Sequence, residues 1–241
     1  MEDRNKIVKY LCDKLEPRGD IYAFWIEGSV PQGYADEFSD IDLWLSVDDD
    51  KIFTIYGDIE QILAEISPID FRYVVKNKGE LGQNVYHLQG MSEFLTVDVN
   101  TQGISRDPRD SILVKGIDDA EIIFDKQNVI KFKERESANT DIGAKRKKLQ
   151  DFYLQMHPSL LKNIRRGKIL EALYYYHLIL RYTTKFLRLK YGCHEKTDFD
   201  LKHIYRDIPE GEVRNLERFY DVRASEIENI LPELEVWIKG L

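Results

Sequence analysis

The pattern of hydrophobic residues changes near residue 140, and this change limits the possible folds of the 241-residue chain more than any other feature. Before it, short apolar runs with period two are mixed with a few segments of helical period. After it, apolar residues recur only at three- and four-residue spacing. The first pattern predicts an α+β domain with a mixed sheet and the second a helical bundle. We therefore expect two domains, residues 1–138 and 139–241, divided within the polar stretch 135–141.

The expected elements of the first domain are two helices and six strands. The helices cover 5–15 and a segment that starts at the aspartates 48–50 and ends at 66, before Pro68. The strands are expected at 22–26, 41–47, 69–75, 84–88, 94–101 and 121–124. In the second domain, helical periodicity covers 142–166, 168–191 and 211–239, and 198–206 suits a short helix.

The composition excludes several classes of protein. With 43% hydrophobic and 32% charged residues, the chain can bury a core and keep a charged surface, unlike a disordered protein. Cys12 and Cys193 lie far apart without zinc-ligand spacing, which predicts reduced thiols. The N-terminal segment lacks the features of a secretory signal, and no stretch reaches the roughly 20 apolar residues of a spanning helix. We expect a cytoplasmic protein with no membrane partner.

Charge is divided unevenly within the overall net charge of −8. Acidic residues are in excess in the first 141 residues, whereas basic residues are in excess in 142–206. A protein that binds duplex nucleic acid usually presents a broad basic face, so that partner is disfavoured. The division favours a small anion, such as a nucleotide, held between an acidic metal site and basic side chains.

The most informative motif joins a Gly-Ser turn to a pair of aspartates. Gly28 and Ser29 follow one predicted strand, and Asp40 and Asp42 stand at the start of the next. Because side chains alternate along a strand, the two carboxylates lie on one face, where a divalent cation relieves their repulsion. Mg²⁺ is commonly held between carboxylates and phosphates. The backbone N–H groups at Gly28 and the Ser29 hydroxyl can donate to phosphate oxygens.

A third carboxylate, Asp98, lies on a later predicted strand. Leu95, Val97 and Val99 alternate with polar residues there, so Asp98 leaves the strand on the face opposite the apolar side chains. It can join Asp40 and Asp42 across neighbouring strands. It would then either ligate the metal or accept the proton of an attacking hydroxyl.

This arrangement resembles the nucleotidyltransferase superfamily that includes DNA polymerase β and the antibiotic nucleotidyltransferases. The resemblance rests on an apolar-Gly-Ser motif, ten residues, Asp-apolar-Asp-apolar, and a later strand aspartate. The stretch from Gly28 to Leu45 is most similar to small bacterial members that modify aminoglycosides or lincosamides, which add a C-terminal helical bundle. The resemblance implies catalysis and the binding of two Mg²⁺ ions by Asp40, Asp42 and Asp98.

One departure from the family concerns the phosphate-binding turn. Many relatives have a basic residue shortly after Gly-Ser, whereas Val30, Pro31 and Gln32 follow here. A helix over 168–191 offers other cations, because Glu171, Tyr174, His177, Arg181, Lys185 and Arg188 share one stripe. We expect Arg181 and Lys185 to bind the nucleotide phosphates. Glu171 stays open as an alternative to Asp98 as the general base.

These observations predict a Mg²⁺-dependent enzyme. It would transfer a nucleoside monophosphate from an NTP, with ATP the expected donor, to a hydroxyl of a small-molecule acceptor and release pyrophosphate. Asp36 and Glu37, on the loop before Asp40, favour a cationic acceptor such as an aminoglycoside-like antibiotic. The alternative is a nucleotide-binding or regulatory, antitoxin-like module that kept this fold and lost useful catalysis.

Overall fold

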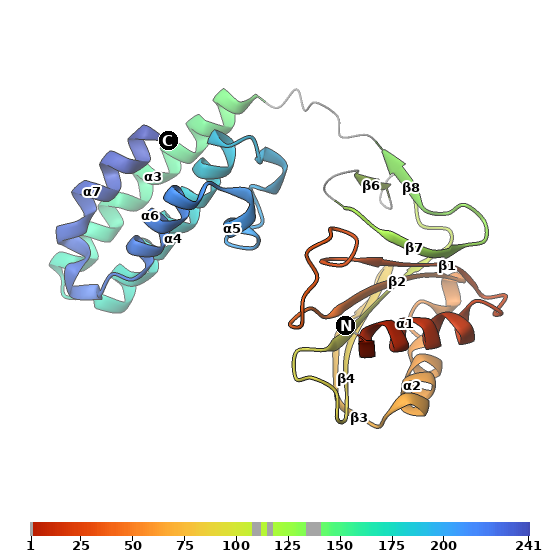
Figure 1. The fold of residues 1–241 in the computed structure, drawn as a ribbon. Helices are drawn as coiled ribbons and strands as arrows, with labels where there is room; N and C mark the ends of the chain where they lie inside the picture. The colour runs from red at the N-terminus through yellow and green to blue at the C-terminus, as the bar shows by residue number, and fades with distance from the viewer. Residues whose placement is uncertain (1, 108–111, 115–117, 134–140) are drawn as a thin grey trace. The chain divides into compact units, whose positions relative to one another are not determined.

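The structure is a computed structural model that describes residues 2–107, 112–114, 118–133 and 141–241. The chain forms two compact units, residues 1–138 and 139–241, and each unit has its own hydrophobic core (Figure 1). The polar stretch at 135–141, where the sequence places the domain boundary, lies outside the described residues except for Asp141.

The first unit is built on a six-stranded sheet with the order β3-β4-β5-β2-β1-β7. Strands β2 and β5 are parallel, and all other neighbours in this sheet are antiparallel. This mixed sheet, followed by a helical unit, confirms the α+β prediction. The strands are β1 (Ile21–Glu27), β2 (Ile41–Val47), β3 (Ile69–Lys78), β4 (Leu81–Leu88), β5 (Thr96–Gly103) and β7 (Glu121–Asp125).

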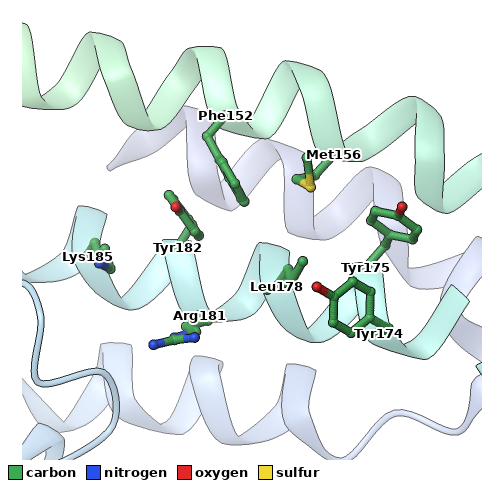
Figure 2. Close-up of a pocket in the computed structure, with 8 residues that line it drawn as sticks. All are labelled: Phe152, Met156, Tyr174, Tyr175, Leu178, Arg181, Tyr182 and Lys185. Carbon is green, nitrogen blue, oxygen red and sulfur yellow. The ribbon is translucent and has the colours of Figure 1, made fainter. Parts of the chain in front are cut away.

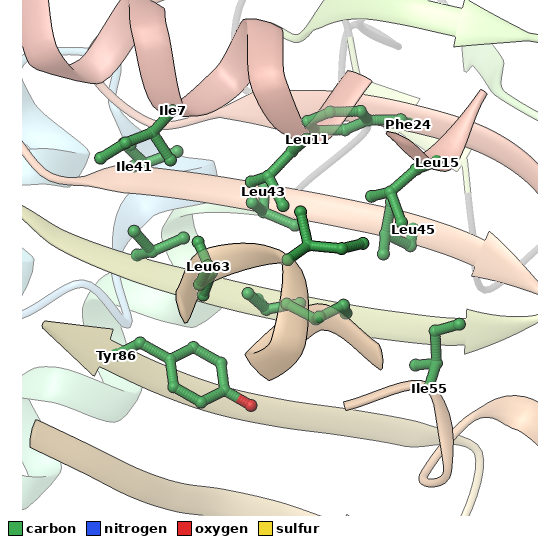
Figure 3. Close-up of a cluster of buried hydrophobic side chains, with 14 of the residues drawn as sticks. Ile7, Leu11, Leu15, Phe24, Ile41, Leu43, Leu45, Ile55, Leu63 and Tyr86 are labelled. Carbon is green, nitrogen blue, oxygen red and sulfur yellow. The ribbon is translucent and has the colours of Figure 1, made fainter. Parts of the chain in front are cut away.

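Two helices, α1 (Glu2–Leu15) and α2 (Ile55–Ile66), cover one face of this sheet. Leu11 of α1 and Leu63 of α2 are fully buried against alternate residues of the strands, among them Leu43 (Figure 3). Alternation along β2 and β5 gives these strands an apolar face toward the helices and a polar face away from them. The polar face carries the candidate site.

The α2 helix begins later than expected. A short 3-10 turn at Asp49–Lys51 precedes it, and Ile55 is its first residue. Asp49 does not cap this helix, because its carboxylate accepts a hydrogen bond from the backbone N–H of Ser105, beyond β5, at 3.1 Å. A contact between distant segments thus displaces the helix start.

Two three-residue strands that the sequence analysis did not predict, β6 (Ile112–Val114) and β8 (Lys131–Lys133), pair in parallel. Near them a small second cluster buries Ala23, Trp25 and Ile130. Since Trp25 alternates with core residues of β1, this cluster lies on the sheet face opposite α1 and α2. The apolar contacts of this cluster cover part of the polar face beside β1.

The second unit is entirely helical in its described residues. Two long antiparallel helices are followed by a short helix and by two more that pack on the same core. Their bounds are α3 (Ile142–Arg165), α4 (Ile169–Lys190), α5 (Ile204–Asp207), α6 (Glu210–Tyr220) and α7 (Ile227–Gly240). Across both units, no described helix combines the length and apolar character needed to cross a membrane.

The single helix expected at 211–239 is wrong, because the chain breaks between α6 and α7. The backbone N–H of Arg223 donates to the Glu226 carboxylate at 3.1 Å, an arrangement that starts a new helical segment. The break lets Phe219 before it and Ile227 after it enter one core, where both are fully buried. Apolar residues keep their helical spacing through the break, so the sequence pattern does not reveal it.

Candidate active site

The predicted carboxylates lie on the polar face of the sheet. Asp42 of β2 stands directly opposite Asp98 of the parallel strand β5, and on its other side opposite Glu27 of β1. Asp40 lies one residue before β2, and its charge acts on Asp98. Residues directly opposite in a ladder present their side chains to the same face. The fold therefore brings Asp40, Asp42 and Asp98 to one region, with a fourth acid beside them.

Asp98 is held by two side-chain amides. Gln83 Nε2 donates to one carboxylate oxygen at 2.8 Å, and Asn100 Nδ2 donates to the other at 3.2 Å. Burial raises the pKa of Asp98 above its ordinary value, and the charge of Asp40 raises it further, although both amide bonds act in the opposite direction. Asp98 is thus an oriented carboxylate that binds a proton more readily than an exposed aspartate.

The Gly-Ser turn lies directly beside the carboxylates. Gly28 has a φ of +80°, and a Cβ atom at this position would lie 2.1 Å from Oδ2 of Asp42, so only glycine fits. The next residue, Ser29, has a buried Oγ with no hydrogen-bond partner among the described residues. A buried hydroxyl without a partner costs free energy, and a ligand bound at the turn would satisfy it.

The sequence analysis missed Glu27. Its carboxylate accepts a hydrogen bond from Trp25 Nε1 at 2.8 Å, and burial raises its pKa above the ordinary value. Trp25 in turn stacks on Trp44, with ring centroids 5.7 Å apart. The sequence carried no signal for it, because residues 21–26 are apolar without alternation, and its place on the face of Asp42 follows only from the register of β1 with β2.

The described side chains do not form a ready-made metal site. Within the described part of the chain, no three His, Cys, Asp or Glu side chains are close enough together to hold a metal ion. The chemistry of these side chains nevertheless suits Mg²⁺, which prefers oxygen ligands. The carboxylates of Asp40, Asp42 and Asp98 provide such oxygens on one face of the sheet. The Asp42 carboxylate occupies the space that a side chain at residue 28 would take, so the turn lies directly against it.

Arg181 and Lys185, the expected phosphate-binding cations, belong to the helical unit and already have acidic partners. Arg181 pairs with Asp200 at 2.6 Å, and Lys185 pairs with Asp198 at 2.8 Å. Both line an open groove of about 450 Å³ between α3 and α4, and Tyr182 also lines it (Figure 2). The described contacts of these two cations are all within their own unit.

The other residues of the predicted stripe on α4 are divided between surface and core. Glu171 is exposed and pairs with Lys168 at 3.1 Å. Arg188, expected on the solvated face, is instead completely buried and pairs with Asp207 at 2.5 Å. Its guanidinium also donates to the carbonyl of Lys202 at 2.6 Å. The expectation for Arg188 was wrong because the segment after α4 folds back over it.

The family comparison supports the interpretation of this face. Residues 4–90 match the family model described as a nucleotidyltransferase domain. This part of the first unit is thus similar to nucleotidyltransferase domains. The match includes the turn at Gly28 and Ser29 and both Asp40 and Asp42, whereas Asp98 lies beyond its end. The resemblance inferred from the motif is confirmed. No curated protein sequence matches the chain.

Ten chains of solved structures also match. One, described as "structure of GLD-2/RNP-8 complex", is 13% identical, with a TM-score of 0.33. The match covers 78% of the present chain and 57% of that chain, so this chain spans little more than half of its length.

Proposed function

We propose that this nucleotidyltransferase domain transfers a nucleoside monophosphate from an NTP, with ATP the expected donor, to a hydroxyl of a small-molecule acceptor. The observation that carries the proposal is the buried Ser29 hydroxyl without a described partner, which directly follows Gly28, the residue that lies against the Asp42 carboxylate. A phosphate oxygen would satisfy that hydroxyl. Carboxylates on the same face provide for the metal that accompanies a triphosphate.

Each residue has a distinct role in this reaction. The backbone N–H groups of the turn and Ser29 Oγ would donate to phosphate oxygens, and Asp40 and Asp42 would hold Mg²⁺. Bound Mg²⁺ would neutralise the charge of the triphosphate and of the leaving pyrophosphate. The acceptor oxygen forms a bond to the α-phosphorus while the bond to the pyrophosphate oxygen breaks.

Asp98 is the best-supported acceptor of the hydroxyl proton. It lies opposite Asp42, and two amides fix its orientation, whereas Glu171 is exposed on another unit. Its raised pKa brings it closer to the range of an effective general base. Asp98 can also serve as a third metal ligand, since its two oxygens allow both contacts.

The nature of the acceptor is proposed from charge. Asp36 and Glu37 are exposed on the loop before Asp40, and acidic residues near an entrance attract a cationic guest. An amine-bearing sugar, as in aminoglycoside-like antibiotics, is therefore included among the acceptors to be tested.

Pyrophosphate release tests the proposal. The purified protein is incubated with Mg²⁺, each of the four labelled NTPs, and a panel of neutral, cationic and anionic small molecules that carry hydroxyls. We expect release that requires both Mg²⁺ and an acceptor, together with a labelled acceptor product. Removing Mg²⁺ with EDTA should stop both signals.

Binding without turnover would support the alternative function. If the protein binds an NTP with Mg²⁺ but releases no pyrophosphate with any acceptor, it is a nucleotide-binding module that lost catalysis. The feature that favours this alternative is the sequence after Ser29, where Val30, Pro31 and Gln32 provide no basic residue.

Substitution of Gly28 tests the turn. Gly28→Ala is expected to lower the rate of pyrophosphate release about 100-fold, because its Cβ displaces the Asp42 carboxylate and small displacements of a catalytic group are costly. Steady-state kinetics and chemical denaturation measure the rate and the free energy of unfolding.

Gly33→Ala is the matched control. Gly33 has a φ of +75°, close to that of Gly28, but a Cβ atom there would meet no described atom within 4 Å. Both variants should lose about 1 kcal/mol of stability from the left-handed backbone, and only Gly28→Ala should lose activity. Equal rates for the two variants would contradict a close approach of the turn to Asp42.

A further inference from the structure

Two exposed aromatic side chains lie on the same sheet face as the carboxylates. Tyr73 of the edge strand β3 stands opposite Val85 of β4, which in turn stands opposite Asp98 of β5. One row of residues therefore runs across five strands and includes the two aspartates: Tyr73, Val85, Asp98, Asp42 and Glu27. Phe71, two residues before Tyr73, joins the next row through His87 of β4.

We call Phe71 and Tyr73 the aromatic strip. Their exposed fractions are 50% and 59%, so neither ring is part of the core. The opposite face of β3 differs, since Arg72 there pairs with Glu60 of α2 at 3.0 Å. The strip is thus an exposed aromatic surface on the face that carries the carboxylates, and such surfaces often mark binding sites.

The distance from the strip to the reacting groups suits a small molecule. Neighbouring strands are separated by 4.7–4.9 Å, so the backbone at Tyr73 lies about 10 Å from that at Asp98, two strands away. This is roughly the length of two linked six-membered rings. A ligand with a hydroxyl at Asp98 would therefore place its far ring on the strip.

A second aromatic pair flanks the carboxylates. Phe38 lies two residues before Asp40, and Phe94 lies four residues before Asp98. Their rings meet edge to face with centroids 5.1 Å apart, and their exposed fractions are 59% and 47%. Aromatic surfaces thus occur at the loops leading to the carboxylates as well as on β3. The combination favours a ligand with apolar ring faces and disfavours a polyanion.

We propose that the aromatic strip binds the acceptor, by stacking against the apolar face of a ring that lies about 10 Å from the hydroxyl that reacts. Phe71 and Tyr73 would then determine which acceptors are used, while the carboxylates carry the chemistry. This inference rests on the proposed function, because it takes the carboxylates as the place of reaction.

Two glucosides that share the same hydroxyls test the proposal. Methyl β-D-glucoside carries one ring, and 4-nitrophenyl β-D-glucoside adds a second, aromatic ring. Binding of each probe to the full chain is measured by equilibrium dialysis, in the presence of Mg²⁺ and a non-hydrolysable ATP analogue. We expect the nitrophenyl probe to bind about 5- to 10-fold more tightly, the factor given by an aromatic contact.

Variants on the two faces of β3 locate the contact. Phe71→Ala and Tyr73→Ala should each reduce the preference for the nitrophenyl probe, and Tyr73→Phe should keep it. The matched control is Val74→Ala, because Val74 is 41% exposed on the same strand but stands opposite the buried Asn84. Loss of preference in Val74→Ala as well, or equal binding of both probes to the unaltered protein, would refute the proposal.

Two further outcomes separate this inference from the proposed function. No pyrophosphate release with any acceptor, combined with a ring preference that depends on Phe71 and Tyr73, would refute the proposed catalysis alone. Release without any ring preference would refute the role of the strip alone. Size-exclusion chromatography tests whether the strip instead joins two copies of the chain. That role would be shown if Phe71→Ala and Tyr73→Ala convert a dimer to a monomer and leave the binding of both probes unchanged.

Discussion

Asp42→Asn is expected to reduce nucleotidyl transfer about 1000-fold or more, the scale seen when a group that stabilises transition-state charge is lost. Asp42 lies between Asp98 and Glu27 in the ladder and beside the Gly28 turn, so it is the central acid of the face. Asparagine keeps the shape of the side chain and removes its charge, which weakens the hold on Mg²⁺. Pyrophosphate release at saturating NTP and Mg²⁺ measures the loss.

The same substitution should leave the metal-free protein equally stable or more stable. Burial is the main cause of the raised pKa of Asp98, the charge of Asp40 raises it further, and Asp42 adds a third carboxylate to this region. Removing one charge relieves the repulsion among them, which is the usual trade between stability and activity at a functional site. Chemical denaturation in EDTA measures the free energy of unfolding.

Asp50→Asn provides the control, because Asp50 is exposed on a turn outside this face. It should change neither the rate nor the stability. A strong loss of stability in Asp42→Asn, with unchanged Mg²⁺-dependent nucleotide binding, would show that Asp42 is structural and that the metal lies elsewhere.

The second large effect is expected in the helical unit. Arg188→Ala should lower its stability by about 3–5 kcal/mol, the usual cost of breaking a buried ion pair by removing one partner. Arg188 is completely buried, and its guanidinium joins Asp207 to the carbonyls of Asp200 and Lys202. Its loss removes this donor from the two carbonyls and from Asp207 Oδ2, while Lys196 Nζ still donates to the other oxygen of Asp207 at 2.9 Å. Thermal and urea denaturation of the full chain measure the effect.

An exposed ion pair on α6 serves as the comparison for this substitution. Arg214 pairs with Glu210, and the two side chains are 73% and 78% exposed. Arg214→Ala should therefore cost less than about 1 kcal/mol. Similar losses of stability for Arg214→Ala and Arg188→Ala would mean that the buried ion pair of Arg188 with Asp207 does not stabilise this unit.

The candidate site was largely predictable because strand alternation is a local property. The apolar residues around Asp42 and Asp98 reveal which face each aspartate occupies without any knowledge of the tertiary structure. The same reasoning does not reach Glu27, because residues 21–26 are all apolar and only the pairing of Glu27 with Asp42 shows which face it occupies. The pairing of β2 with β5 was not available from either segment alone, since it joins residues 56 positions apart in sequence, as at Asp42 and Asp98.

Two kinds of feature were not predictable: those set by tertiary packing, and a local helix break within a continuous apolar pattern. Arg188 has the spacing of an exposed stripe on α4, and its burial is caused by the chain that returns at Asp207. The break between α6 and α7 is set by a contact of Arg223 with Glu226 within a continuous apolar pattern. The free Ser29 hydroxyl requires the packed turn around it, which no residue pattern describes.

The parallel pairing of β2 with β5 affects the order in which the parts of the candidate site form during folding. The β1–β2 hairpin joins segments close in sequence, whereas β5 is added across α2, β3 and β4. Pairings between distant segments form late in folding, because the chain must first close a long loop. A nascent chain therefore carries the Gly-Ser turn and Asp42 well before Asp98 is synthesised. In the proposed reaction Asp98 joins Asp42 only once β5 is inserted, so a chain that has not yet added this strand would not consume nucleotide.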